Sequence, residues 1–262
     1  GIRWRSDWRH CGVCAAMIWR LILTCALSLI PVSGWAAVSW DTDTTCQAAS
    51  GTTNTCNHTI GTGSNVYVGV CEFTRNATTA ADVTAVTIAG SAGTHIATAN
   101  DATDGTNIRV EMWGRALGST NGSIAVDSTW DRTDAPRIVV FSMFGVDQGT
   151  PVGTAQTSTS TYPTSLSVNV SSAANELVAS CLGTDASTTS ITVGAGQTEQ
   201  WINTNTAGNS TQDQGSTEPG GATVTMSHSW TGVAYAALVA APFKAATASA
   251  TVCRRMLMGV GC

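Results

Sequence analysis

Residues 136–154, PRIVVFSMFGVDQGTPVGT, contain the densest run of β-branched and aromatic residues beyond the first 36 positions of the chain. Nearly every position from 138 to 146 is apolar, which is typical of a strand that is covered on both faces. The run ends in GVDQGTP, a sequence rich in turn-forming residues. We therefore expect an inner strand of a β-sandwich here, followed by a turn.

Shorter segments with strand patterns lie on both sides of this run. The clearest are 66–73, 83–88, 108–117, 166–170, 177–182, 222–229 and 232–243. Residues 155–165 and 205–221 are dominated by polar residues and predict surface loops. No segment predicts a helix with conviction, and we find no internal repeat of fixed period. The predicted fold class is all-β, a jelly-roll-like antiparallel β-sandwich of about ten strands.

The N-terminal region has the features of a secretory signal. Arg20 precedes an apolar stretch at 21–30, and the small residues Gly34 and Ala36 suit cleavage after Ala36. Ten apolar residues are too few to cross a bilayer. We interpret 1–16 as upstream translation and 17–36 as the signal, with a buried N-terminal helix as the alternative. Residues 37–244 are then expected to form a single β-sandwich domain, and 245–262 a C-terminal tail.

Charge argues against one class of partner. Residues 37–262 hold 8 Lys and Arg against 16 Asp and Glu, and Lys244 is the sole lysine. The acidic residues are scattered, and no basic patch for nucleic acid is present.

From the predicted signal we expect an exported protein that is extracellular, at the cell surface or periplasmic, without a transmembrane anchor in the mature chain.

Six cysteines follow the predicted cleavage point: Cys46, Cys56, Cys71, Cys181, Cys253 and Cys262. An even number in an exported chain predicts disulfides, although six cysteines allow 15 pairings. Two pairs are close neighbours in the sequence, Cys46 with Cys56 and Cys253 with Cys262. The two that remain, in strand-like segments, are either a long-range pair or two free buried thiols.

The segment FSMFGVDQGTP resembles the FSGVDQxxP signature of β-sandwich modules in uncharacterised bacterial and phage proteins. Downstream, NELVASCLG is similar to the next strand of those modules, and WTGVAYAALVAAPFK to their closing strand. Met143 and Phe144 depart from the small-residue spacing that usually precedes the glycine. The resemblance covers about residues 64–244 and implies a jelly-roll-like sandwich in a secreted, surface or virion protein. It implies no catalytic residue.

Motifs for catalysis or metal binding are sparse. A Ser/His/Asp site would need a placed nucleophile such as a GxSxG elbow, which does not occur. His58, His95 and His228 are far apart in the sequence, and residues 37–262 contain no HxxxH, HExxH or CxxC pair. The one cofactor hypothesis is a structural calcium ion. Its candidate ligands are Asp101 and Asp104 with Gly105, or Asp127, Asp131 and Asp134, all of which could equally be turn formers.

A row of side chains on the predicted strand 108–117 is the candidate binding site. Arg109, Glu111, Trp113 and Arg115 alternate onto one face, and a carboxylate, an aromatic ring and guanidinium groups together are typical of sugar-binding sheets. The alternatives are a solvated face with cross-strand ion pairs, or a buried Trp113 with the charges at the strand ends.

The predicted function is that of an exported, non-catalytic β-sandwich protein with a surface-binding or structural role. Its expected partner is a glycan or another cell-surface ligand, and association with a virion is a further option. The alternative is a carbohydrate-active hydrolase of the β-sandwich class, which requires two carboxylates on one concave sheet face. The sequence identifies no such pair, and the ExDxE strand of laminarinase-like sandwich hydrolases is absent.

Overall fold

Every regular element in the described part of the chain is a β-strand. The computed structural model describes residues 37–47, 51–76, 80–102, 107–132, 136–185, 190–204 and 212–247, all within one unit, 35–247. The strands are β1 (Ser39–Gln47), β2 (Thr53–Ile60), β3 (Val66–Asn76), β4 (Val83–Ile88), β5 (Ser91–Ala92), β6 (Thr94–Asp101), β7 (Asn107–Gly118), β8 (Gly122–Trp130), β9 (Arg137–Phe144), β10 (Gln156–Thr161), β11 (Ser165–Val170), β12 (Leu177–Thr184), β13 (Ile191–Val193), β14 (Thr198–Asn203), β15 (Gln212–Pro219), β16 (Val224–Trp230) and β17 (Tyr235–Phe243).

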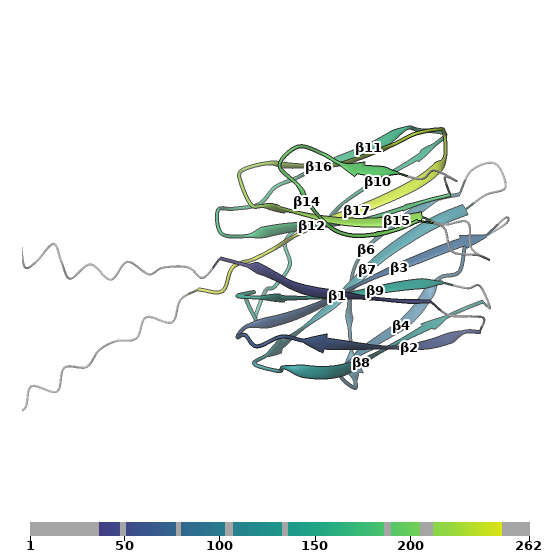
Figure 1. The fold of residues 1–262 in the computed structure, drawn as a ribbon. Coiled ribbons are helices and arrows are strands. Elements are labelled where there is room, and N and C mark those ends of the chain that lie inside the picture. The colour runs from purple at the N-terminus through teal and green to yellow at the C-terminus, as the bar shows by residue number, and fades with distance from the viewer. Residues whose placement is uncertain are drawn as a thin grey trace, which may run out of the picture. The chain divides into compact units, whose positions relative to one another are not determined.

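The strands form four antiparallel sheets. We name them sheet I (β2-β8-β4-β5), sheet II (β1-β9-β3-β7-β6), sheet III (β10-β17-β12-β15-β14) and sheet IV (β11-β16-β13). Three hydrophobic cores lie between them, one between sheets I and II, one between II and III, and one between III and IV. Figure 1 shows the resulting stack of four layers, with the strands of the first half of the chain in two adjacent layers and those of the second half in the other two.

Sheets II and III are covered on both faces, which explains the sequence of β9. Ile138 and Val140 point into the core between sheets I and II, whereas Val139, Phe141 and Met143 point into the core between II and III. Because alternate residues of a strand face opposite sides, a strand between two cores is buried on both faces, and six of the eight residues of β9 are apolar. The prediction of an inner strand is confirmed.

Each half of the chain is a jelly roll. In this topology one sheet holds the first, eighth, third and sixth strands, and the other holds the second, seventh, fourth and fifth. Sheets II and I follow this order when β5 and β6 are taken as one fifth strand, which passes from sheet I to sheet II at Gly93. Sheets III and IV repeat it, except that the fifth strand, β14, stays in sheet III. The predicted class is confirmed, and the described residues hold 17 strands rather than about ten.

The two rolls correspond in detail. The sequence NVYVGVCEFT around β3 matches NELVASCLGT around β12, and both begin with an asparagine at positive φ, 54° for Asn65 and 71° for Asn175. Trp130 and Trp230 end equivalent strands, and the backbone N–H of each donates to a threonine carbonyl before the second strand of its roll. Sheets II and III even share a register shift at the same place in their fifth strands.

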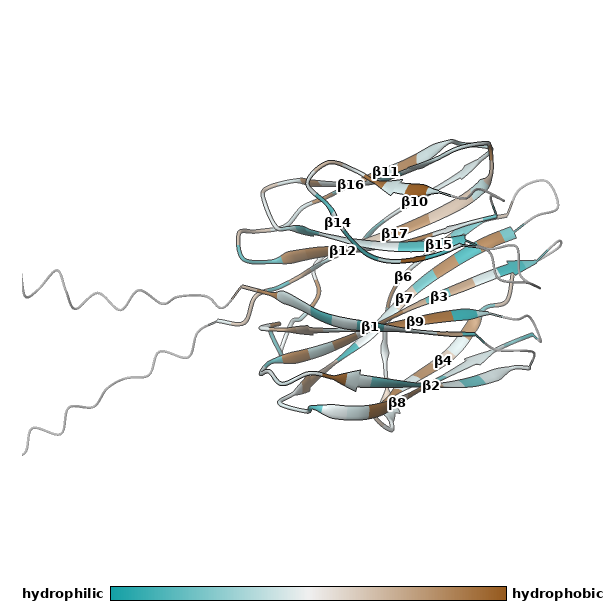
Figure 2. Ribbon diagram, in the orientation of Figure 1, coloured by the Kyte–Doolittle hydropathy of each residue, from teal (hydrophilic) through white to brown (hydrophobic). Residues whose placement is uncertain are grey.

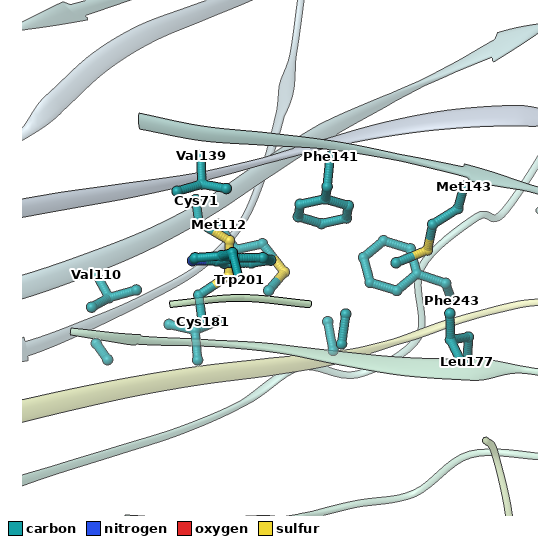
Figure 3. Packing of buried hydrophobic residues seen from close by; sticks show 14 of the residues in the cluster. Cys71, Val110, Met112, Val139, Phe141, Met143, Leu177, Cys181, Trp201 and Phe243 are labelled. Atoms are coloured by element: carbon teal, nitrogen blue, oxygen red, sulfur yellow. A yellow bond between two sulfur atoms is a disulfide. The ribbon is translucent and has the colours of Figure 1, made fainter. Parts of the chain in front are cut away.

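Two disulfides are present in the described residues. Cys46–Cys56 joins β1 to β2, and Cys71–Cys181 joins β3 to β12 across the core between sheets II and III (Figure 3), with Cα atoms 5.7 Å and 6.3 Å apart. Both bonds were among the predicted pairings, and they indicate folding in an oxidising, exported environment. Cys253 and Cys262 lie outside the described residues.

Cys71 and Cys181 occupy equivalent positions of the two rolls, 110 residues apart. Arg75 and Asp185 lie four residues further along their segments, are also equivalent, and form an ion pair of 3.5 Å. Equivalent residues can meet one another only at a symmetry axis. The two rolls are therefore related by an approximate two-fold axis that runs between sheets II and III, along β3 and β12.

Two predicted loops are wrong. Residues 155–165 include β10, which is an edge strand of sheet III, and residues 205–221 include β15, which lies inside sheet III between β12 and β14. The polar sequence of β15 hid this, yet its first six residues are buried. Figure 2 shows its hydrophilic colour within the stack. Hydrogen bonds make this burial tolerable, because the buried side chains of β15 have hydrogen-bond partners within the protein, with Glu218 Oε2 as an unpartnered exception. Asp213, for example, pairs with Arg137 of sheet II, and Ser216 with Ser180.

In the described residues there is no helix, and hence none with the length and hydrophobicity needed to cross a bilayer.

Candidate functional site

A groove of about 580 Å³ lies where β6, β7 and the linker between the two rolls meet. This volume falls within the range of small-molecule binding sites. The groove is lined by Thr94 to Ile96 of β6, by Gly114 to Ala116 of β7, by Tyr67 of β3, and by linker residues between 148 and 153.

The floor of the groove depends on Gly114. A Cβ atom at this position would collide with the Tyr67 hydroxyl and ring. The absence of a side chain thus leaves room for Tyr67, whose ring packs edge-on against Phe243 at a centroid distance of 5.2 Å. Burial raises the pKa of Tyr67, so its hydroxyl is a neutral hydrogen-bonding group.

The linker wall is built by the GVDQ sequence that follows β9. Gly145 adopts φ 73°, which turns the chain away from the strand. The Asp147 carboxylate accepts hydrogen bonds from the N–H groups of Thr150 and Gly149, at 2.7 and 2.9 Å, and these bonds lower its pKa. Gln148 fixes the wall to the sheet, because its Oε1 accepts from Gly118 N at 2.7 Å and its Nε2 donates to a backbone carbonyl at 2.8 Å. These hydrogen bonds hold the turn against the end of β7.

The lining of the groove combines apolar and hydrogen-bonding surfaces. Ile96, Pro151 and Val152 supply apolar contact area. Its polar lining residues are Thr94, His95, Arg115 and Gln148, which carry hydroxyl, imidazole, guanidinium and amide groups. No aspartate or glutamate is among the described residues that line it.

The predicted row on β7 lies beside this groove. Glu111 is only 2% exposed and accepts hydrogen bonds from Arg109 Nε at 2.6 Å, Trp113 Nε1 at 3.2 Å and Val83 N at 3.1 Å. Both of its oxygens are therefore used within the protein. Arg109 also pairs with Asp82 at 2.9 Å. These contacts give Arg109 and Glu111 a role in holding β7 against sheet I.

Trp113 and Arg115, the other half of the row, are half-buried. The Trp113 ring packs against the core between sheets I and II and meets the ring of His95 edge-on at 4.8 Å. Arg115 donates from Nη1 to the Ile88 carbonyl at 2.8 Å and lines the groove. Arg115 is one of the residues predicted from the sequence, whereas His95 entered there only as a candidate for catalysis. The strand pattern of β6 is weak, and its pairing with β7 is not visible in the sequence.

Buried polar clusters occupy the same place in each roll. In the first, Glu72 accepts a hydrogen bond from Ser128, and burial raises its pKa to about 8, with a further contribution from the nearby Glu111. In the second, His228 contacts Ser180 Oγ at 3.0 Å and Gln214 Oε1 at 2.7 Å, and burial lowers its pKa to about 4. Both clusters lie between sheets, away from solvent.

The calcium candidates have other partners. Asp101 faces Thr161, Asp127 accepts from Thr55 at 2.6 Å, and Asp131 accepts from Asp82 N at 2.9 Å. Asp104, Gly105 and Asp134 lie outside the described residues. Within the described ranges, no group of three or more His, Cys, Asp or Glu side chains is placed to hold a metal ion.

Comparison with protein-family models, with curated proteins and with solved structures gives no match. The resemblance to the FSGVDQxxP modules thus stays a prediction. What the structure adds is a physical role for the residues that carry it, since Gly145, Asp147 and Gln148 form and fix the turn that walls the groove.

Proposed function

We propose that this chain is an exported, non-catalytic binding protein that takes a glycan in the groove between β6, β7 and the linker. The extracellular space, the cell surface and the periplasm all suit such a role, and the disulfides are compatible with each. The observation that carries the proposal is the lining of the groove, which sets apolar side chains beside donors of several kinds. Sugars present both C–H faces and hydroxyl groups, and a site of this mixed character suits both.

A hydrolase is the competing proposal. Glycosidases use two carboxyl groups on either side of the scissile bond. The described residues that line the groove contain none, and the nearby Glu111 is buried with both oxygens engaged. These observations favour binding without turnover.

The test is a glycan array on the secreted protein, followed by titration calorimetry with the glycans that bind. Thr94→Trp fills the groove from an exposed rim position, whereas Ser167→Trp places the same ring on an exposed position of sheet IV. We expect Thr94→Trp to abolish binding and Ser167→Trp to preserve it. Binding that survives Thr94→Trp would place the ligand elsewhere, and product release from the bound glycans would favour the hydrolase.

A further inference from the structure

Arg115 differs from the other arginines of the described residues. Arg75, Arg109, Arg132 and Arg137 each have a carboxylate oxygen within 4.0 Å. Arg115 has none in the described ranges, although the chain is acidic overall. Its guanidinium is instead held by the bond from Nη1 to the carbonyl of Ile88. A guanidinium has five N–H donors, so this bond orients the group and leaves donors for a ligand.

The second jelly roll shows that the fold does not require a cation at this position. Strand registers pair Val68 of β3 with Arg115, and the equivalent Val178 of β12 with Glu218. The position of Arg115 is thus taken by a carboxylate in the other roll. The position of His95, which faces Trp113 in the same way, is likewise taken by Glu199. The same strand geometry accepts either charge at the position of Arg115, so the fold does not require the guanidinium of the first roll.

We propose that the groove recognises an acidic sugar, with the carboxylate of a uronic-acid residue bound by Arg115. This inference rests on the proposed glycan-binding function and adds the chemical class of the ligand. A carboxylate matches the planar fork of a guanidinium, and the pair is stronger when both groups are partly removed from water. No carboxylate lines the described groove to repel the ligand, and the hydroxyl-bearing Thr94 lies beside it for hydrogen bonds to sugar hydroxyls.

The experiment compares acidic trisaccharides with their methyl esters, which have nearly the same shape without the charge. Uronic-acid trisaccharides of galacturonate, mannuronate and glucuronate type are titrated by calorimetry into the wild-type protein, Arg115→Gln and Arg115→Lys. Arg132→Gln is the matched control, because Arg132 is exposed and paired with Asp131 away from the groove. We expect at least one acid to bind about tenfold more tightly than its ester, the scale of a charged hydrogen bond. Arg115→Gln should remove that preference, lowering the affinity for the acid far more than the affinity for the ester.

Arg115→Lys should retain part of the preference, since the charge remains without the fork. Raising the salt concentration should weaken binding of the acid but not of the ester. Thermal melting of each variant confirms that it is folded, and Arg132→Gln should match the wild type throughout. Equal affinity for every acid and its ester, or an equal loss of both in Arg115→Gln, would overturn the acidic-sugar inference while leaving the glycan groove intact. An array on which no glycan binds would overturn the proposed function as well.

Discussion

Glu72 makes the stability of the protein depend on pH in a way that one substitution can remove. Its side chain is 1% exposed, one oxygen accepts from Ser128, and the other has no hydrogen-bond partner among the described residues. Burial therefore favours the protonated carboxyl and raises its pKa from 4.5 to about 8. Because the folded state holds this proton more tightly than the unfolded state, the stabilisation is full below pH 4.5 and is lost as the pH rises towards 8.

The size of the effect follows from the pKa difference. Each unit corresponds to about 1.4 kcal/mol, so the loss approaches about 4–5 kcal/mol as an upper limit. Glu72→Gln keeps the shape and a donor where the protonated carboxyl had one, but does not titrate. We expect the difference in unfolding free energy between the variant and the wild type to change in favour of the variant by up to about 4 kcal/mol from acid to alkaline solution.

The assay is urea denaturation followed by tryptophan fluorescence at a series of pH values from about 4.5 to 9, which brackets the titration. The matched control is Glu176→Gln, a carboxylate in the loop before β12. Its unfolding curves should run parallel to those of the wild type at every pH. If the curves of Glu72→Gln also run parallel to the wild type, the buried, protonated carboxyl is refuted.

Three further predictions use other parts of the stack. The Cys71–Cys181 bond closes a loop of 110 residues, so breaking it should lower the free energy of unfolding by about 4–5 kcal/mol in the chain-entropy account. Loss of the Cys46–Cys56 bond, which closes a much shorter loop, should cost less. Equal shifts of the melting temperature on removing either bond would contradict this. Trp113→Ala should cost about 2–3 kcal/mol by chemical denaturation, since the ring is half-buried and its N–H is bonded to Glu111; a loss below about 1 kcal/mol would make the ring an exposed platform. Burial lowers the pKa of His228 from 6.5 to about 4, so its contribution of up to about 3 kcal/mol is full above pH 6.5 and is lost as the pH falls towards 4. His228→Gln should abolish that acid loss, and an unchanged acid limb would show that other groups cause it.

The features that can be predicted from the sequence are those that determine the spacing of its apolar residues. Strand β9 is apolar at six of its eight positions because it separates two cores, and the alternation of β7 put its charged residues on one face. What periodicity could not reveal is how those charges are satisfied. The partners of Glu111 come from β7 itself and from Val83, and whether a carboxylate is solvated or enclosed depends on the sheet placed over it.

Strand β15 shows the opposite failure. Its sequence, QDQGSTEP, has no apolar residue, and composition alone predicts a loop. In the structure the Trp201 ring lies directly over Gly215, where any Cβ atom would collide with it. Asp213 forms an ion pair with Arg137. A polar strand can be buried only when each polar group has a partner. Those partners come from β9, β12, β14 and β16, strands that local sequence cannot bring together.

The internal duplication was missed for a physical reason as well. A jelly roll specifies the order of its strands but not the lengths of its loops, so the spacing between equivalent residues differs from strand to strand and no fixed period survives. The equivalence is visible only once the registers are known. It also resolves the one pairing that the cysteines left open, because residues at a two-fold axis face their own counterparts, as Cys71 and Cys181 do.

The same equivalence of the two rolls distinguishes residues that maintain the fold from residues of the candidate site. The asparagines, the cysteines and the terminal tryptophans are shared by both rolls and maintain the fold, whereas Arg115 and Glu218 occupy one position with opposite charge. The fold tolerates either charge at this position, so the requirements of a ligand can account for which residue is found there. In the first roll this position lines the groove.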